Sequence, residues 1–298
     1  MQAPVQATTA AAWYTNLPRL GQISFINSLP VILPIEKQHL QLPCEIVLGS
    51  PAELNALYAR GALDLGAMSS FFYLEHGGFE LVPEIAISCN GPVGSVLFFS
   101  KVSPHRLKGA RVAVPASSAT SVNLLKVLLI DQLNVCPELV VESEPDLDSP
   151  DVEGALVIGD RALAVDADWS NRFWRADLGQ WWVSRTGLPM VFGVWAGRSE
   201  WVREHPDQFK IIGTILNQSA ELGLSALLPL VVSEARSRTG LEPIVLNRYF
   251  RNQLSFRMTQ RHRDGLEHFR ELCQQYGLFT HAGDGVLAGS ATGKKATG

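Results

Sequence analysis

Five short polar segments follow apolar runs in this chain, and their residue types suit the binding of a small anion. The segments are Asn27-Ser28, Ser69-Ser70, 91–95, 118–121 and Asp160. If the apolar runs are strands of parallel α/β sheets, these segments lie beyond the carboxyl ends of the strands, where such sheets bind ligands. Three of them also begin predicted helices, whose free N–H groups and positive dipole ends attract negative charge. The pattern predicts a cleft for a small molecule with several negative charges, such as a dicarboxylate.

Each segment also has a structural explanation on its own. Ser, Thr or Asn at a helix start is more often only a cap, Asp160 is more often a cap or an ion-pair partner, and Gly91-Pro92 alone is a turn. Ligand binding is favoured because all five segments fall on the same edge of the predicted sheets.

The sequence motifs of several common enzyme classes are absent. There is no G-x-S-x-G, H-E-x-x-H, P-loop or G-x-G-x-x-G sequence, so nothing indicates a hydrolase, a zinc enzyme or a nucleotide-binding protein. The 7 histidines are dispersed, and the 4 cysteines form no C-x-x-C pair. We therefore expect reduced, buried thiols and no metal site.

Length and composition predict two domains and limit the partners. The chain has 298 residues, of which 46% are hydrophobic, enough for substantial cores. A net charge of -4 without a basic block argues against nucleic acid and anionic membranes as partners. The first 18 residues hold no Lys or Arg and no continuous apolar run, and no run elsewhere is long enough to span a membrane. We expect a cytoplasmic protein and make no prediction of its oligomeric state.

The order of apolar runs and helix signals predicts α/β lobes. Strands are expected at 19–25, 44–48, 63–68, 111–114 and 155–158, separated by helices, as in sheets built from βαβ units. Ser50 and Glu53 form a predicted capping box, and further helices are expected from Asn27 or Ser28, from Ser69, after 118–121, over 177–186 and in most of the chain after 199.

A hinge is predicted between two such lobes. The turn Asn90-Gly91-Pro92 joins the apolar runs 84–88 and 96–99, and a later run at 190–196 is placed to carry the chain back. We interpret these runs as two strands that cross between the lobes. The predicted first lobe is 19–99 with 197–281 and the second is 100–196, with an extension at 1–18, a solvated connection at 142–153 and a disordered tail at 282–298.

Seven motifs, in one collinear order between residues 19 and 279, resemble those of one enzyme family. They are I-x-F-I-N-S-L-P at 23–30, G-S-P-A-E-L-N at 49–55, L-D-L-G-A-M-S-S at 63–70, S-C-N-G-P-V-G-S-V-L-F-F-S at 88–100, S-A-T-S-V-N-L-L at 118–125, I-G-D-R-A-L at 158–163 and T-G-L-P-M-V-F-G-V-W-A at 186–196. The chain resembles the chorismate dehydratases of the futalosine route to menaquinone. The resemblance implies an α/β, two-lobed periplasmic-binding-protein-like type II fold with two hinge-crossing strands and C-terminal helices. It also implies conversion of chorismate to 3-[(1-carboxyvinyl)oxy]benzoate and water.

By motif position, the resemblance implies that Asn27 and Ser95 are catalytic, each through hydrogen bonds. The residues implied to bind the substrate are Ser28, Ser69, Ser70, Gly91, Val93, Ser118, Ala119, Thr120, Ser121 and Asp160. No metal or cofactor is implied, because the loss of water makes the ring aromatic. No strong base stands out among these residues, so the proton acceptor is either Asp160 or the substrate's own enolpyruvyl carboxylate.

Other functions stay open. One is 1,4-dihydroxy-6-naphthoate synthase, a lyase of the same pathway and fold, over which the N-S-L-P and G-P-V-G-S motifs favour the dehydratase. Another is a solute-binding protein for a small organic anion, against which the lack of an export signal speaks. A catalytically inactive sensor is less attractive, because Asn27 and Asp160 are both intact.

Overall fold

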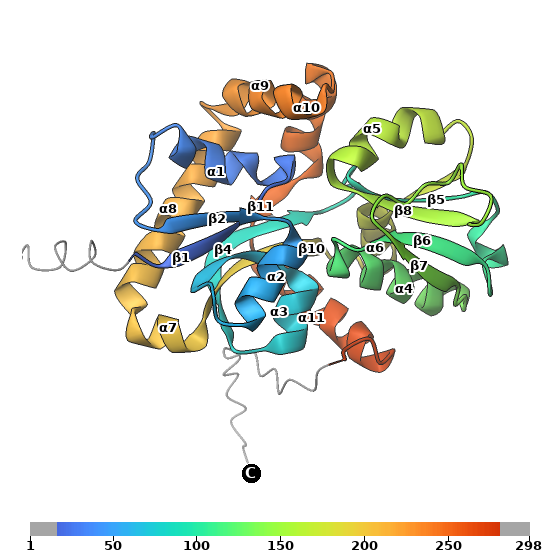
Figure 1. The fold of residues 1–298 in the computed structure, drawn as a ribbon, viewed down its shortest axis with the longest axis horizontal. Helices are drawn as coiled ribbons and strands as arrows, with labels where there is room; N and C mark the ends of the chain where they lie inside the picture. Colours follow the sequence, from blue (N-terminus) through green and yellow to red (C-terminus); the bar gives the residue numbers. More distant parts are fainter. Residues whose placement is uncertain (1–16, 281–298) are drawn as a thin grey trace, which may run out of the picture.

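The computed structural model describes residues 17–280, which form two α/β lobes side by side (Figure 1). Each lobe is built around one β-sheet with helices on its faces. The predicted disordered tail at 282–298, and all but the last two residues of the predicted extension at 1–18, lie outside the described residues.

The first lobe begins with alternating strands and helices, as the sequence predicts. Its first elements are β1 (Arg19–Ile23), the short helix η2 (Ile26–Ser28), α1 (Leu29–Glu36), β2 (Glu45–Gly49), α2 (Pro51–Ala59), β3 (Leu65–Ser69), α3 (Ser70–His76) and β4 (Phe79–Cys89). β1 pairs in parallel with both β2 and β3. The predicted capping box is confirmed, since Ser50 Oγ accepts the N–H of Glu53 and the Glu53 carboxylate accepts the N–H of Ser50.

The second lobe repeats this alternation. Its elements are β5 (Val96–Ser100), the short helix η3 (Pro104–Arg106), β6 (Arg111–Pro115), α4 (Ala119–Leu133), β7 (Glu138–Glu142), β8 (Gly154–Ile158), α5 (Gly159–Trp169), β9 (Trp174–Asp177) and α6 (Leu178–Thr186). β6 runs parallel to β7 and β8, whereas β5 runs antiparallel to β8 and β9. Two predicted helix starts are confirmed, because Ser118 caps α4 and Asp177 caps α6.

The chain then returns to the first lobe and covers it with helices. The returning elements are β10 (Met190–Arg198), α7 (Ser199–Glu204), α8 (Pro206–Leu224), α9 (Leu228–Thr239), α10 (Pro243–Arg248), the π-helical turn η4 (Tyr249–Gln253), β11 (Ser255–Arg257) and α11 (Gln260–Gln275). α8 packs on α1 and β4, as expected for helices that return to the first lobe. α11 packs on β10 and also contacts α4 of the second lobe, so it bridges the two lobes.

The lobe crossing differs from the prediction. The first sheet has the order β11-β4-β10-β3-β1-β2 and the second has the order β7-β6-β8-β5-β9, so β5 belongs to the second lobe and β10 to the first. The predicted boundaries at 99/100 and 196/197 are therefore wrong, and the chain crosses in loops at 90–95 and 187–189. We call residues 90–95 the crossing loop. An apolar run shows that a strand is buried but not which sheet supplies its hydrogen-bond partners, and here β10 pairs with β3 and β4 on either side.

Three short strands and one buried connection are not predicted by the sequence. β7, β9 and β11 are five, four and three residues long. Such short segments, without a clear alternation of buried and exposed residues, give little strand signal. The 142–153 connection is also not fully solvated, because Leu147 and Val152 are buried in the core. They pack with Leu97, Phe99 and Trp169 on one face of the second sheet.

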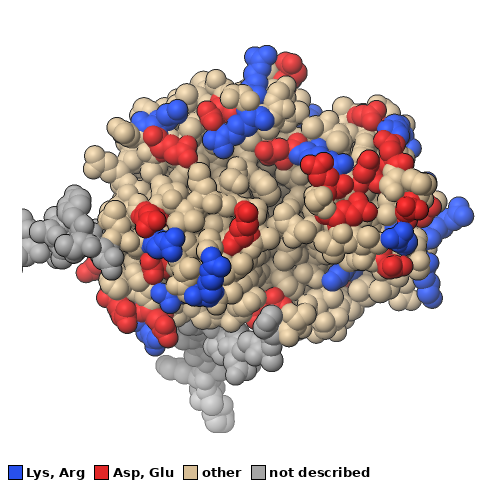
Figure 2. All heavy atoms as spheres, in the orientation of Figure 1, with Lys and Arg blue, Asp and Glu red and all other residues tan. Residues whose placement is uncertain are grey.

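Most of the buried apolar side chains form one cluster that continues from one lobe into the other. It includes Leu20 and Met68 of the first lobe, Phe98 and Leu125 of the second, and Phe269 of α11. Within residues 17–280, no single helix is long and apolar enough to cross a membrane. The helices α8 and α9 meet these criteria of length and composition only together, and they are bent by 83° relative to each other. Basic and acidic side chains are intermingled over both lobes in the face drawn in Figure 2.

Candidate active site

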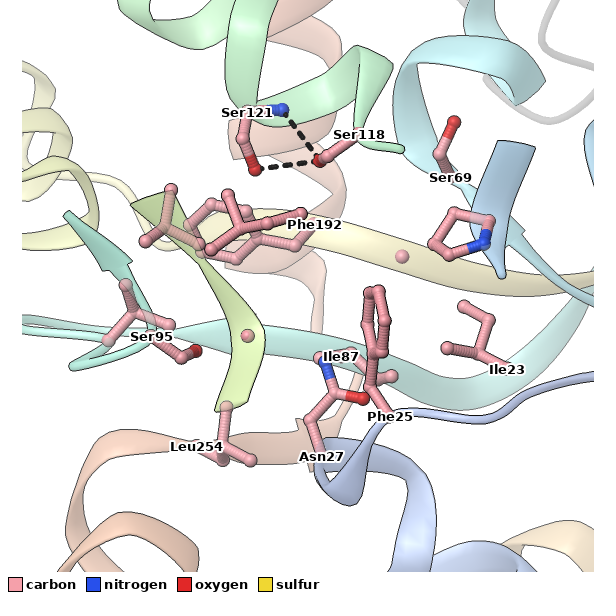
Figure 3. Close-up of a pocket in the computed structure, with 16 residues that line it drawn as sticks. Ile23, Phe25, Asn27, Ser69, Ile87, Ser95, Ser118, Ser121, Phe192 and Leu254 are labelled. Carbon is pink, nitrogen blue, oxygen red and sulfur yellow. Dashed lines mark hydrogen bonds between the residues drawn. The ribbon is translucent and has the colours of Figure 1, made fainter. Parts of the chain in front are cut away.

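A cavity lies where the two lobes face each other, and both lobes line it (Figure 3). It contains about 570 Å³ of space free of protein atoms, part of which opens to solvent. The lining residues are Ile23, Phe25, Asn27, Pro51, Ser69, Ile87, Val93, Ser95, Val96, Ser118, Ser121, Ile158, Gly159, Phe192, Gly193 and Leu254. None of them is Lys, Arg, Asp or Glu, so the wall offers apolar surface and neutral hydrogen-bonding groups.

Asn27 brings an amide to the first-lobe wall. It lies in η2, just after β1, and Figure 3 shows its side chain in the cavity beside Phe25. Its Oδ1 is buried and accepts no hydrogen bond from residues 17–280. Because an unsatisfied buried acceptor costs about 1–3 kcal/mol, this oxygen is ready to accept a hydrogen bond from a ligand.

Ser118 and Ser121 lie across the cavity, at the N-terminus of α4 in the second lobe. The N–H of Ser121 donates to Ser118 Oγ (3.3 Å), and the Ser118 hydroxyl donates to Ser121 Oγ (2.9 Å). The Ser118 hydrogen is therefore used, whereas no acceptor in the described chain takes the Ser121 hydrogen. The Ser121 hydroxyl can donate to a ligand beside the positive end of a 15-residue helix.

Ser69 is a second free donor, at the end of β3. Its Oγ accepts hydrogen bonds from Asn55 Nδ2 (3.1 Å) and from the N–H of Phe72 (3.2 Å). Both acceptor positions of the hydroxyl are thus occupied by protein donors. The hydrogen of this buried side chain is left for a ligand in the cavity.

Ser95 is a third free donor, at the end of the crossing loop. Its Oγ accepts a hydrogen bond of 2.9 Å from Tyr249 Oη, and no described acceptor takes its hydrogen.

The crossing loop is fixed by Asp177, whose carboxylate accepts the N–H groups of Val93 (3.0 Å) and Gly94 (2.7 Å). Asp177 thereby holds the crossing loop on the start of α6.

The cavity therefore offers three hydroxyl donors and one amide acceptor. The donors are Ser69, Ser95 and Ser121, and the acceptor is Asn27 Oδ1. Donor groups on a wall that itself carries no carboxylate stabilise negative charge, and an unpaired acceptor favours a ligand that also carries a hydroxyl group. The arrangement suits a small organic anion with a hydroxyl.

Comparison with known proteins agrees with the sequence motifs. A family model described as menaquinone biosynthesis matches residues 18–275. The chain is 37% identical over 238 residues to the chorismate dehydratase of Thermus thermophilus. The aligned region covers 74% of this chain and 83% of that protein. This chain belongs to the chorismate dehydratase family of menaquinone biosynthesis.

Solved structures agree on the fold of this family member. Protein AF1704 from Archaeoglobus fulgidus matches with a TM-score of 0.69 at 19% identity, over 89% of this chain and 99% of that one. The alkanesulfonate-binding protein SsuA from Xanthomonas axonopodis pv. citri matches with a TM-score of 0.64 at 16% identity, over 88% of this chain and 93% of that one. The predicted periplasmic-binding-protein-like fold is confirmed.

Asp160 of this dehydratase-family chain lies at the lobe boundary. It is in the first turn of α5 and accepts a long hydrogen bond of 3.4 Å from the N–H of Ile26 in the first lobe. Burial raises the pKa of Asp160 above its ordinary value, and the Ile26 hydrogen bond and the charge of Arg238 oppose that rise. Asp160 is not among the cavity-lining residues, and its carboxylate contacts the backbone of the neighbouring lobe at Ile26.

Six of the predicted site residues line the cavity, namely Asn27, Ser69, Val93, Ser95, Ser118 and Ser121. The other six, including Asp160, do not. Ala119 follows the lining residue Ser118, and Gly91 lies two positions before the lining residue Val93. Ser28, Ser70 and Thr120 are buried and form hydrogen bonds elsewhere. The Ser28 hydroxyl points back to the carbonyls of Ile23 (2.6 Å) and Phe25 (2.9 Å). The predicted side-chain cap of α1 does not form, because the backbone of Ser28 is helical rather than extended as in an N-cap residue.

Ten of the 16 lining residues, and two residues that support the lining, are not predicted as site residues. Phe192 and Leu254 line the cavity, Asn55 supports Ser69, and Tyr249 supports Ser95. Asn55 and Phe192 lie inside motifs of the family resemblance, which is a usable signal. Tyr249 and Leu254 lie outside those motifs, in a part of the chain that the sequence predicts only as mostly helical, so the sequence holds no such signal for them.

The cysteines match the prediction of buried thiols only in part, because Cys89 and Cys273 are buried whereas Cys44 is half-buried and Cys136 is exposed. Across residues 17–280, no group of three or more His, Cys, Asp or Glu side chains is placed to hold a metal ion. Cys89, at the end of β4, is buried, and burial with the nearby charge of Asp177 raises its pKa to about 12. A thiol with that pKa is not a nucleophile at neutral pH.

Proposed function

We propose that this protein removes water from chorismate to form 3-[(1-carboxyvinyl)oxy]benzoate, in the futalosine route to menaquinone. Family membership supports the reaction. The observation that supports this cavity as its site is the presence of three free hydroxyl donors together with the unpaired Asn27 oxygen. Chorismate has two carboxylates and a ring hydroxyl, which are the groups that such a wall would bind.

The two carboxylates are matched to donors from different parts of the chain. Ser121 and the start of α4 serve one carboxylate from the second lobe, and Ser69 and Ser95 serve the other groups from the first lobe and the crossing loop. Because the wall has no fixed positive charge, these neutral donors carry the recognition.

Asn27 is assigned to the hydroxyl at C4, which leaves in the reaction. An amide both donates and accepts hydrogen bonds, so Nδ2 can stabilise the departing oxygen while Oδ1 holds its hydrogen. An amide does not serve as a general base, so the proton at C3 must go to another group.

The substrate's own enolpyruvyl carboxylate is assigned as the proton acceptor. The C3–H bond breaks and its proton passes to that carboxylate, its electron pair forms the ring double bond, and the C4–O bond breaks. The carboxylic acid then gives its proton to the departing hydroxide, which leaves as water. Asp160 is the less suitable base because its carboxylate engages the N–H of Ile26. Aromatisation drives the step, so we propose that no metal or cofactor takes part.

The test is to incubate the purified protein with chorismate and follow the aromatic product by absorbance and mass spectrometry. We expect a product one water lighter than chorismate, formed equally well after treatment with a chelator. Asn27→Ala, prepared in the same way, controls for contaminating enzymes and should show little turnover. Bound chorismate recovered unchanged would support a solute-binding protein instead. The cytoplasmic location stays a prediction.

A further inference from the structure

Tyr249 is a buried tyrosine whose hydroxyl ends at the cavity wall. It lies at the start of the π-helical turn η4 in the first lobe and is 0% exposed. Its hydroxyl donates to Ser95 Oγ over 2.9 Å, across 154 positions of sequence. Single π-helical turns within helices are often found at functional sites, and this one ends against the catalytic cavity.

The rest of the same segment also rests on the crossing loop. Gly94 has a φ of +72°, and a Cβ there would lie 2.5 Å from Gln253 Oε1, so the Gln253 side chain covers the loop closely. The next residue, Leu254, lines the cavity. Residues 249–254 therefore pack over the loop that carries Ser95, and Tyr249 is the member of this segment that bonds Ser95.

The Tyr249 bond decides what the Ser95 hydroxyl offers to a ligand. Since Tyr249 donates, its proton occupies an acceptor position of Ser95 Oγ, and the Ser95 hydrogen has no acceptor in the described chain. Burial raises the pKa of Tyr249, so it keeps this proton throughout the physiological range. Without the tyrosine hydroxyl, Ser95 could rotate and accept from a ligand as readily as donate to it.

We propose that Tyr249 is a positioning residue for the dehydration, which holds Ser95 as a hydrogen-bond donor toward the substrate. The inference rests on the proposed function, because it concerns the catalytic use of Ser95. Tyr249 acts only through Ser95 and does not touch the substrate. Its loss should therefore change turnover more than binding, because the alignment of Ser95 matters most in the transition state.

The experiment compares Tyr249→Phe with a matched control, Tyr58→Phe. Tyr58 is also a buried tyrosine, and its hydroxyl donates to the carbonyl of Leu65 (3.0 Å) away from the cavity. We expect both variants to lower the thermal midpoint by a similar amount. Only Tyr249→Phe should lower kcat, by about tenfold, less than the ~100-fold that a misplacement of 1 Å can cost, with KM little changed.

A double-substitution cycle with Ser95→Ala separates positioning from a general structural effect. If Tyr249 acts through Ser95, adding Tyr249→Phe to Ser95→Ala should leave kcat where Ser95→Ala alone places it. Losses in kcat that multiply would overturn the inference, as would a Tyr249→Phe enzyme that turns over like the wild type. Both outcomes leave the proposed function standing, whereas a wild-type protein without turnover removes the function and the inference together.

Discussion

The backbone N–H of Phe71 in the first lobe donates a hydrogen bond of 3.1 Å to the hydroxyl of Thr120 in the second. Thr120 Oγ1 also lies 3.3 Å from the hydroxyl of Ser70, which donates to the carbonyl of Val191. Ser70 and Thr120 are both buried, and each lies in the first turn of its helix, α3 or α4. This contact therefore sets how closely the polar starts of the two helices approach, and with them the two walls of the cavity.

Replacing Thr120 by Val should loosen this contact. The change keeps the shape of the side chain but leaves the buried N–H of Phe71 without its acceptor, which costs about 1–3 kcal/mol. We expect a lower thermal midpoint and a KM that rises more than kcat falls, as measured by calorimetry and steady-state kinetics. Thr120→Ser, which retains the hydroxyl, should restore most of both. If Thr120 instead binds substrate directly, KM should rise while the ligand-free protein keeps its stability.

Asn27→Asp should remove activity in a protein that still folds. A carboxylate in the cavity repels a dianionic substrate and lacks the amide's donor, so we expect kcat/KM to fall by roughly 100- to 1,000-fold. No hydrogen bond of Asn27 Oδ1 among the described residues is lost, so the loss of stability should come only from the buried charge and should shrink at acidic pH, where the carboxyl is neutral. Kinetics and thermal unfolding, measured on the same sample, check both points. A variant that keeps more than a tenth of wild-type kcat/KM would show that Asn27 is not at the reacting centre.

Asp177→Asn should free the crossing loop. The Asp177 carboxylate accepts the N–H groups of Val93, Gly94 and Gln180 through its two oxygens, and an amide has only one acceptor oxygen. We expect a loss of stability of about 1–3 kcal/mol and faster hydrogen exchange at the amides of Val93 and Gly94. The control is Asp166→Asn, which weakens the ion pair with Arg175. Asp166 is more exposed than Asp177 and does not bond the crossing loop. Equal exchange at those two amides in both variants would contradict the role of Asp177.

Asp160→Asn should stabilise the protein at neutral pH. Because the pKa of Asp160 is raised in the folded state, the folded protein holds that proton more tightly than the unfolded chain. Ionisation then costs stability as the pH rises above the ordinary value of 3.8. The variant should melt at a higher temperature than wild type near pH 7, and the difference should shrink as the pH falls toward that value. Thermal unfolding of both proteins across that range measures this.

The same variant tests the proton acceptor. If the substrate's carboxylate takes the proton, Asp160→Asn should keep turnover within a few-fold of wild type in single-turnover assays. Selective loss of the proton-transfer step, with chorismate binding intact, would assign the base to Asp160.

The sequence by itself determined the α/β class, the order of most strands and helices, and the positions of the polar segments. These features are local: a capping box such as Ser50 and Glu53 needs only residues three apart, and an apolar run followed by Ser or Asn marks where a strand ends. The polar segments therefore contain four residues of the cavity wall, Asn27, Ser69, Ser95 and Ser118, and the family resemblance added the catalytic roles expected for Asn27 and Ser95.

Only the tertiary structure decided which strand joins which sheet and what each hydroxyl does. All residues of β5 and most residues of β10 are buried, so their sequences suit either sheet, and the available backbone partners settled the question. The sequence looks the same whether a serine or threonine caps a helix, bridges two lobes or binds a ligand. Thr120 became a contact between the lobes because Phe71 lies opposite, and Ser95 became a donor because Tyr249, far away in sequence, reaches its oxygen. Hydrogen-bond direction depends on three-dimensional neighbours, which no local pattern contains.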